Sequence, residues 1–521
     1  MHPYQHATSR PDHPAIVIAD TGSVLTYREL DERSNRIAHV FRSAGLAPGD
    51  CIALMAQNSA EFATVYWAAQ RSGLLCAMLS THLKPDEAAY IINDCGAKLL
   101  LTEADLGDTA TALAANSATL IPNVVAVYEI HGAPLRGAGS LAEAMAEKKP
   151  TPIDDQTAGY YLIYSSGTTG RPKGIVLPYS RGPIDALAHN EALSLQRPLA
   201  DAVSMAPGPL YHAAPLVEML TSHRLGSTFV TMRKFDPETV LDAIERWKVE
   251  RAWFVPTMFV RMLALPDEVR QRFDLSTLQD VSHAAAPCPI EIKRRMIDWL
   301  GPIMSEYYSA SESIGGTRIS SAEWLRKPGS VGRPRPGVTV YICDENGKEL
   351  PHGHEGLIYF ADPGARDFRY LNDPGKTKES QHPIHPERHA VGDIGRVDED
   401  GYLFLTDRKD FMIISGGVNI YPQAVEDALI VHPKVLDAAV IGIPNPDFGE
   451  EVLAIIQPKR WSDAGDALGE ELIEWCKNRI SRVSCPRSVT FTEQIPRLPS
   501  GKLAKHELRR LYGAEMPPSA G

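Results

Sequence analysis

The feature that most constrains this chain is a glycine- and hydroxyl-rich segment of eleven residues, Tyr164-Ser-Ser-Gly-Thr-Thr-Gly-Arg-Pro-Lys-Gly174. Strand-like runs flank it at residues 160–164 and 175–177. Its glycines let the backbone turn with N–H groups exposed, and its hydroxyls and Lys173 add donors and charge. This combination suits a polyphosphate, although Pro172 stands where a Walker A loop has glycine. The segment predicts a phosphate-binding turn between two strands rather than a plain surface turn.

Composition excludes several classes of protein. Lys and Arg total 53 and Asp and Glu total 65, which gives a net charge of −12 over 521 residues. Such a chain is unsuited to non-specific nucleic-acid binding or to a polybasic membrane anchor. No apolar stretch approaches the ~20 residues of a membrane span, and no secretory leader is recognisable. The seven cysteines form no CxxC pair, which favours a reduced, cytoplasmic protein over a disulfide framework.

Apolar runs and helix patterns alternate along the chain, which predicts an α/β fold. Thr26-Tyr-Arg-Glu29 is a capping box that predicts a helix start, and Asn58 to Glu61 repeats that pattern. Residues 51–55 and 98–101 are typical of buried strands. The charged break Asp407-Arg-Lys-Asp410 predicts a boundary between a large domain, residues 1–409, and a small α/β domain, residues 410–521, with helices near 423–431 and 470–480.

Further segments carry chemistry in a fixed order. They are His283-Ala-Ala-Ala-Pro287, Tyr307-Tyr-Ser-Ala-Ser-Glu312, Gly392-Asp393, Asp407-Arg-Lys-Asp410, Ser415-Gly-Gly-Val-Asn-Ile-Tyr-Pro422 and Pro496-Arg-Leu-Pro-Ser-Gly-Lys502. With the phosphate segment, they make the chain resemble the AMP-forming acyl-CoA synthetases, within the superfamily of adenylating enzymes that includes aryl-CoA ligases and beetle luciferase. The resemblance runs from about residue 15 to residue 510.

The resemblance implies a fold and a reaction. The fold is a large N-terminal adenylation domain of stacked αβα subdomains plus a distorted β-barrel, with a small mobile α/β lid domain at the C-terminus. The reaction uses ATP and Mg²⁺ to convert a carboxylic acid to acyl-AMP, and CoA then takes the acyl group. The expected partners are these small molecules, and a homodimer is possible.

The resemblance also implies an ATP site. The phosphates would bind Ser165, Ser166, Gly167, Thr168, Thr169, Gly170, Lys173 and Ser311. The adenine and ribose would lie against Ala284, Ala285, Ala286, Pro287, Tyr308, Asp393 and Arg408. Thr168 and Glu312 would hold magnesium, because a carboxylate beside a polyphosphate needs a cation between them. Ser309 and Ser311 depart from the family's usual Gly and Thr, but Ser311 keeps the hydroxyl.

The C-terminal motifs imply a moving catalytic group. Asp410 matches the family's hinge, and Lys502 matches the catalytic lysine that bridges the carboxylate and the α-phosphate. Ser415, Gly416 and Gly417 would let the pantetheine arm of CoA pass close to the backbone. Val418 stands where many relatives carry a polar residue.

The acyl pocket is also inferred from the resemblance. Its expected lining is His212, Ala213, Ala214, His283, Ser309, Gly315 and Gly316, with His212 near the reacting carboxylate. These residues are mostly small, and Ser309 replaces the tryptophan that shortens the pocket of short-chain relatives. A bulky apolar acid is therefore expected: fatty, aromatic, or a steroid side-chain acid.

Three alternatives to a CoA ligase stay open at this point. The protein could be an acyl-AMP ligase that loads a carrier protein, a luciferase-type oxygenase, or a nucleotide-binding non-enzyme. The presence of Lys173, Glu312, Asp393 and Lys502 favours an enzyme.

Overall fold

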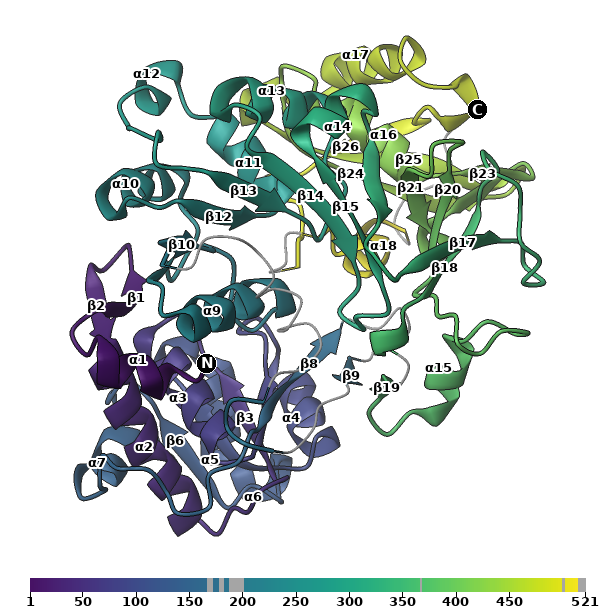
Figure 1. The fold of residues 1–521 in the computed structure, drawn as a ribbon. Coiled ribbons are helices and arrows are strands. Elements are labelled where there is room, and N and C mark those ends of the chain that lie inside the picture. Colours follow the sequence, from purple (N-terminus) through teal and green to yellow (C-terminus); the bar gives the residue numbers. More distant parts are fainter. Residues whose placement is uncertain (166–171, 178–181, 187–200, 366–367, 499–501, 514–521) are drawn as a thin grey trace.

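The structure is a computed structural model that describes residues 1–165, 172–177, 182–186, 201–365, 368–498 and 502–513. Three sheets organise these residues (Figure 1). The longest has 13 described strands in the order β17 (Thr339–Cys343), β18 (Gly356–Ala361), β20 (Asp393–Val397), β21 (Leu403–Arg408), β16 (Ser330–Pro334), β15 (Gly316–Ser320), β14 (Met304–Ser309), β13 (Asp280–His283), β12 (Arg251–Phe254), β10 (Ser204–Met205), β11 (Phe229–Thr231), β1 (Pro14–Ile18) and β2 (Ser23–Thr26).

The second sheet carries the phosphate segment. Its eight described strands run in the order β19 (Arg369–Tyr370), β9 (Lys173–Val176), β8 (Tyr160–Ser165), β4 (Leu75–Met78), β3 (Cys51–Met55), β5 (Ala97–Thr102), β6 (Ala126–Glu129) and β7 (Gly139–Ser140). Strands β4, β3, β5 and β6 pair in parallel, and β8 pairs antiparallel with β9. The two strands that flank the phosphate segment, β8 and β9, therefore form an antiparallel pair beside the parallel strands, and we call this pair the phosphate hairpin.

Helices cover the faces of these two sheets (Figure 1). Their bounds are α1 (Pro3–Ser9), α2 (Tyr27–Ser43), α3 (Ala60–Arg71), α4 (Pro85–Asp94), α5 (Asp108–Ala115), α6 (Ser117–Leu120), α7 (Leu141–Ala146), α9 (Ala213–Leu225), α10 (Pro237–Trp247), α11 (Pro256–Leu263), α12 (Asp267–Arg270), α13 (Ile290–Leu300), α14 (Ser321–Arg326) and α15 (Pro374–Glu379). None of the described helices is both long and apolar enough to cross a bilayer. The α/β fold class is confirmed. In the described pairings, β16, β17, β18, β20 and β21 continue the long sheet, and no closed barrel is found among the described strands.

The sequence patterns predicted one helix start correctly and a second one wrongly. The Thr26–Glu29 capping box is present at the start of α2. The next helix is capped by Ser59, whose side chain accepts from the Phe62 N–H, so the prediction that Asn58 opens it was wrong. Asn58 is buried and donates its amide to Gly208 O at 2.9 Å in the other half of the fold. A buried amide that bridges two segments has no local sequence pattern.

The chain passes from the long sheet to a third sheet between Arg408 and Ile413. The third sheet contains β22 (Ile413–Ser415), β23 (Val418–Ile420), β24 (Val435–Asn445), β25 (Gly449–Pro458) and β26 (Ser488–Phe491). Its helices are α16 (Pro422–Ile430), α17 (Asp466–Lys477) and α18 (Lys505–Tyr512). The change of sheet falls where the sequence analysis placed the boundary, and the division into domains at residues 409 and 410 stays a prediction.

The third sheet is packed on both faces. Ala438 and Val440 of β24 belong to the apolar cluster that includes Leu429 of α16 and Leu472 of α17. Their neighbours Ala439 and Ile441 belong to a second cluster with Leu508 of α18. Alternate residues of a strand point to opposite faces, so one continuous apolar run serves both clusters.

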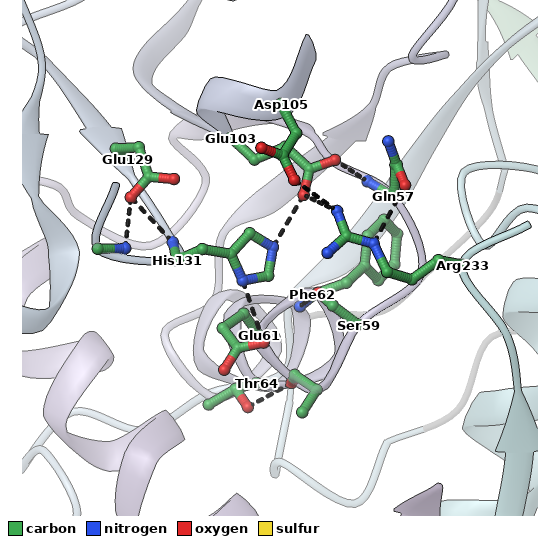
Figure 2. A network of polar contacts seen from close by, with 12 residues as sticks. Gln57, Ser59, Glu61, Phe62, Thr64, Glu103, Asp105, Glu129, His131 and Arg233 are labelled. Carbon is green, nitrogen blue, oxygen red and sulfur yellow. Dashed lines mark hydrogen bonds and ion pairs between the residues drawn. The ribbon is translucent and has the colours of Figure 1, made fainter. Parts of the chain in front are cut away.

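A charged network joins the two larger sheets (Figure 2). Glu103 follows β5 and is fully buried, and its carboxylate lies 2.8 Å from His131 Nε2 and 3.6 Å from Arg233 Nη2. Arg233 follows β11 of the long sheet and also contacts Asp105 at 3.0 Å. Glu61 of α3 lies 3.5 Å from His131 Nδ1. The hydrogen bond that His131 donates to Glu103, more than the charge of Glu61, raises the pKa of His131 above its ordinary value.

We expect His131→Gln to lower the thermal unfolding midpoint more at pH 6 than at pH 8.5. The pKa of His131 is higher in the folded than in the unfolded protein, so its stabilisation is complete below the unfolded value of about 6.5 and is lost as pH rises through the folded value. The loss at pH 6 should be ~1–2 kcal/mol, as for a hydrogen bond to a charged group. The exposed His354→Gln variant is the control. Equal losses at both pH values would contradict a charged His131.

Candidate active site

The stem of the phosphate hairpin is defined by its two strands. β8 ends at Ser165, which pairs with Lys173 at the start of β9. The predicted ligands Ser166, Gly167, Thr168, Thr169 and Gly170 lie outside the described residues. Burial and the nearby Lys376 cation lower the pKa of Lys173, whereas Asp373, Glu379 and Glu312 oppose that shift. Lys173 is thus an amine close to the carboxylate expected to bind metal.

Glu312 lies in the turn that follows β14 and is buried. Its Oε1 accepts the hydroxyl of Tyr370 at 2.7 Å. Ser311 beside it is exposed, and Ser313 adopts a positive φ of 56°. The turn therefore presents Ser311 to solvent and turns Glu312 toward β19.

Asp393 joins three strands of the long sheet. Its Oδ2 accepts the Tyr308 hydroxyl from β14 at 2.5 Å, and its Oδ1 accepts Arg408 Nε from β21 at 3.0 Å. Burial and the Asp393 charge raise the pKa of Tyr308, so its hydroxyl stays protonated. Each carboxylate oxygen has a second lone pair, so Asp393 can still accept two hydroxyls of a ribose.

The Ala284–Pro287 loop follows β13 directly. Ala284 is buried, whereas Ala285 is exposed and has a φ of 75°. This left-handed conformation costs an alanine ~1–2 kcal/mol, and such strain is concentrated at functional sites. The loop carries small side chains, and its role as a slot for adenine stays a prediction.

Lys502 belongs to the C-terminal part of the chain but lies near Arg408, Asp393 and Glu312. Lys502 is exposed as a whole residue, but neighbouring protein atoms desolvate its ammonium group. Desolvation and the Arg408 cation lower the pKa of Lys502, while Asp393 and Glu312 raise it. Its loop is anchored where Arg497 makes two 2.6 Å hydrogen bonds to Asp437 of β24. The structure thus brings Lys502, Arg408, Asp393 and Glu312 into one electrostatic neighbourhood.

His212 borders the same neighbourhood at the start of α9. Burial, followed by the charge of Lys502, lowers the pKa of His212 to about 4. Among the described residues its Nε2 has no hydrogen-bond partner. A neutral imidazole beside Lys502 can donate to or accept from a substrate carboxyl group. Ala213 and Ala214, which follow it, are both half-buried.

The other residues expected to line the acyl pocket are the buried His283, Gly315 and Gly316 and the exposed Ser309, and each of them contacts other protein groups. His283 is fully buried, 5.3 Å from the Phe259 ring centroid and 3.7 Å from Glu306. A Cβ on Gly315 would lie 2.7 Å from Phe360, and one on Gly316 would lie 2.7 Å from Tyr308 O. Ser309 donates its hydroxyl to Gly315 O at 2.8 Å. These contacts give the glycines a packing reason for their small size, independent of a substrate.

The expected hinge residue Asp410 and the expected CoA turn lie at the start of the segment that forms the third sheet. Asp410 is exposed, and its carbonyl accepts Arg509 Nη1 of α18 at 3.2 Å. Gly416 and Gly417 form the two-residue turn between β22 and β23, with φ of 57° and 80°. Two successive positive φ values require glycine or a similar residue there.

Sequence reasoning missed Tyr370 altogether. Its only local signal was its place just before Asp373-Pro374, where Asp373 caps α15. Its partner Glu312 is 58 residues away. A pairing across that separation depends on the sheet register and has no local pattern.

Comparisons with known proteins identify the family of this chain. The model of the AMP-binding enzyme family matches residues 4–366, and that of the AMP-binding enzyme C-terminal domain matches residues 424–502. The crystal structure of an ATP-bound RpMatB-BxBclM chimera superposes with a TM-score of 0.81 at 30% identity, over 99% of both chains.

Curated relatives span nearly the whole chain. A feruloyl-CoA synthase of an Amycolatopsis species is 33% identical over 96% of both chains. A long-chain-fatty-acid–CoA ligase of Mycobacterium tuberculosis is 30% identical over 98% of both. A fatty acid–[acyl-carrier-protein] ligase of Streptomyces coeruleorubidus is 31% identical over 98% of this chain and 95% of its own.

The fold and site define an adenylating enzyme that binds ATP. The chain belongs to the AMP-binding enzyme family, and within it to the acid–thiol ligases of the acyl-CoA synthetase type.

The closeness of His212 to Lys502 can be measured in solution. We expect the imidazole NMR resonance that disappears in His212→Gln to titrate near pH 4, and to titrate at higher pH in Lys502→Ala. Removal of the nearby positive charge makes protonation of the imidazole easier. The exposed Lys459→Ala variant should leave it unchanged. An unchanged titration in Lys502→Ala would mean that Lys502 lies elsewhere in solution.

Proposed function

We propose that this enzyme activates a bulky hydrophobic carboxylic acid as its acyl-AMP and transfers the acyl group to CoA. The observation that carries the proposal is the position of Lys502, among Arg408, Asp393 and Glu312 and beside His212. An acid bound near His212 and an α-phosphate bound near Arg408 would both lie within reach of the same ammonium group.

In the first step the substrate carboxylate attacks the α-phosphorus, and pyrophosphate leaves. Two anions approach one another, so the transition state needs fixed positive charge in a partly desolvated site. Lys502 bridges the two reactants, Arg408 lies at the ribose and α-phosphate, and Lys173 binds the leaving phosphates. His212 is neutral, so it orients the carboxylate by hydrogen bonding without neutralising its negative charge.

Glu312 fits the role of a magnesium ligand. It is a buried carboxylate near Lys173, and hard oxygen ligands are those that Mg²⁺ prefers. One carboxylate oxygen is held by Tyr370. When bound, magnesium supplies charge neutralisation for the β- and γ-phosphates, with Thr168 as the second proposed ligand.

Several contacts support a bulky hydrophobic acid as substrate. Behind α9, Gly208 lies against Pro215, and a Cβ built there would contact Trp253 at 3.6 Å and Met258 at 3.8 Å. Trp253 Nε1 donates to Tyr307 OH at 2.9 Å, which fixes an aromatic wall. Aromatic and aliphatic surfaces of this kind favour an apolar acyl group. The names of the relatives include an aromatic and a long-chain acid.

A basic cavity in the C-terminal part supports CoA as the acceptor. Ser415 and Gly416 line a cavity of about 340 Å³ whose wall includes Lys477, Arg482 and Arg487. Arg487 also packs over the Phe448 ring, 4.0 Å from its centroid. The glycine turn suits a pantetheine arm, and three cations suit the phosphates of CoA.

The second step requires that this turn replace Lys502 at the acyl carbon. Residues 410–521 would rotate about Asp410 relative to residues 1–409. The thiol then attacks the acyl carbon and AMP leaves. Such a rotation lets one cleft serve two transition states in turn.

A carrier protein is the second candidate acceptor. One relative is named as a fatty acid–[acyl-carrier-protein] ligase. The same basic cavity would then face the acidic surface of a carrier protein rather than a nucleotide.

The role of Lys502 is tested by separating the two half-reactions. Lys502→Ala should reduce acid-dependent pyrophosphate release by about a hundredfold or more, because a charged group at the transition state is lost. Thiolysis of supplied acyl-AMP by CoA should stay near wild type, since Lys502 has left the site in that step. The exposed Lys459→Ala variant is the control. Equal loss of both half-reactions would refute the assignment.

The acyl group and the acceptor are tested together by product analysis. Ferulate, a long-chain fatty acid and a steroid side-chain acid should give acyl-CoA at a kcat/KM at least tenfold above acetate, because each buried methylene contributes ~0.8 kcal/mol. Preference for acetate or a dicarboxylic acid would contradict the proposed pocket.

The role of the basic cavity in CoA binding is tested by one substitution. Arg487→Ser should raise the KM for CoA about tenfold, because one charge-assisted phosphate contact is lost, and should leave pyrophosphate release unchanged. Arg460→Ser, an exposed arginine of the same part, is the control. If a carrier protein is turned over and CoA is not, the second candidate acceptor replaces the first.

A further inference from the structure

The short segment Tyr370–Asn372 links both arms of the phosphate hairpin to Glu312. Tyr370 pairs with Ile175 of β9, and the Leu371 N–H donates to Gly174 O at 2.8 Å. The segment therefore continues the sheet directly beside the downstream arm of the hairpin.

The same segment reaches the upstream arm through α4. Asn372 adopts a φ of 55° and donates its amide to the Asp94 carbonyl at 2.9 Å. The Asp94 carboxylate in turn accepts the Tyr164 hydroxyl at 2.6 Å, one residue before the last residue of β8. Both ends of the phosphate hairpin are thus tied to the chain that carries Tyr370.

Tyr370 itself contacts two charged groups of the ATP site. Its hydroxyl donates to Glu312 Oε1 at 2.7 Å, and Lys173 Nζ lies 5.8 Å from its ring centroid. The side chain is buried, and the Phe368 ring packs edge-on at 5.6 Å. Burial and the Glu312 charge raise the pKa of Tyr370, so the phenol stays a donor.

We propose that Tyr370 is a positioning residue for the nucleotide step: its hydroxyl fixes the Glu312 carboxylate for the metal of MgATP, and its ring supports Lys173. A carboxylate with one oxygen fixed presents the other in a defined direction. A divalent ion that keeps near-octahedral geometry tolerates little rotation of such a ligand. The proposal rests on the proposed function, because it assigns magnesium to Glu312.

Replacement of the hydroxyl alone separates positioning from packing. Tyr370→Phe keeps the ring between Phe368 and Lys173 and removes only the donor to Glu312. The matched control is Tyr402→Phe. Tyr402 is equally buried, its hydroxyl lies 3.3 Å from Glu323 Oε1, and Lys327 Nζ lies 5.5 Å from its ring centroid.

The measurement is ATP binding by calorimetry in the absence of acid, at increasing magnesium concentrations. Tyr370→Phe should need about tenfold more magnesium for half-maximal ATP binding, the usual effect of losing a hydrogen bond to a charged group. Tyr402→Phe should match wild type. Thiolysis of supplied acyl-AMP, a step that uses no metal, should be unchanged in both variants.

A double-mutant cycle tests the contact itself. In a Glu312→Gln background, Tyr370→Phe should change the magnesium requirement less than twofold, because the carboxylate it orients is absent. An unchanged magnesium requirement in Tyr370→Phe, or a parallel loss of thiolysis, would overturn the positioning role. Acid-dependent pyrophosphate release by wild type tests the proposed function separately.

Discussion

The site depends first on the Asp393 carboxylate. It accepts hydrogen bonds from Tyr308 of β14 and Arg408 of β21, so this one residue connects β14, β20 and β21 of the long sheet. It also offsets the positive charge of Arg408, which lies close enough to lower the pKa of Lys502. Without Asp393, two cations would face one another in a partly desolvated space. Ligand-binding and sheet geometry therefore rest on the same ion pair.

The net charge of −12 cannot attract ATP or CoA, which are both anions. The structure concentrates cations locally instead. Lys173, Arg408 and Lys502 face the proposed nucleotide site, and Lys477, Arg482 and Arg487 line the cavity beside the glycine turn. In a chain of net negative charge, two such groups of cations favour the binding of anions there over the rest of the protein.

Local patterns in the sequence predicted local structure well. The Thr26 capping box, the strand at residues 51–55 and the helix near 423–431 depend on neighbouring residues, and the structure has α2, β3 and α16 there. The family followed from motifs whose order alone is specific, and the comparisons confirm it.

Predictions failed or were absent where side chains meet across the fold. Asn58 resembles a helix cap but bonds to Gly208 O. His283 packs on Phe259, and its role in the acyl pocket stays a prediction. No local pattern in the sequence indicated the contacts of Tyr370 and His131, because their partners lie 58 and 28 residues away. Sheet register decides such contacts, and register emerges only when all strands are assembled.

The C-terminal sheet buries apolar residues on both of its faces, so α16, α17 and α18 are fixed to a single plate. On the proposed mechanism, this sheet and its helices would turn together as a rigid body. Lys502 and the glycine turn then belong to one rigid unit, so the position of one determines the position of the other. The enzyme would then carry out adenylation and acyl transfer one after the other and never together, and CoA would be kept from the cleft for as long as Lys502 occupies it.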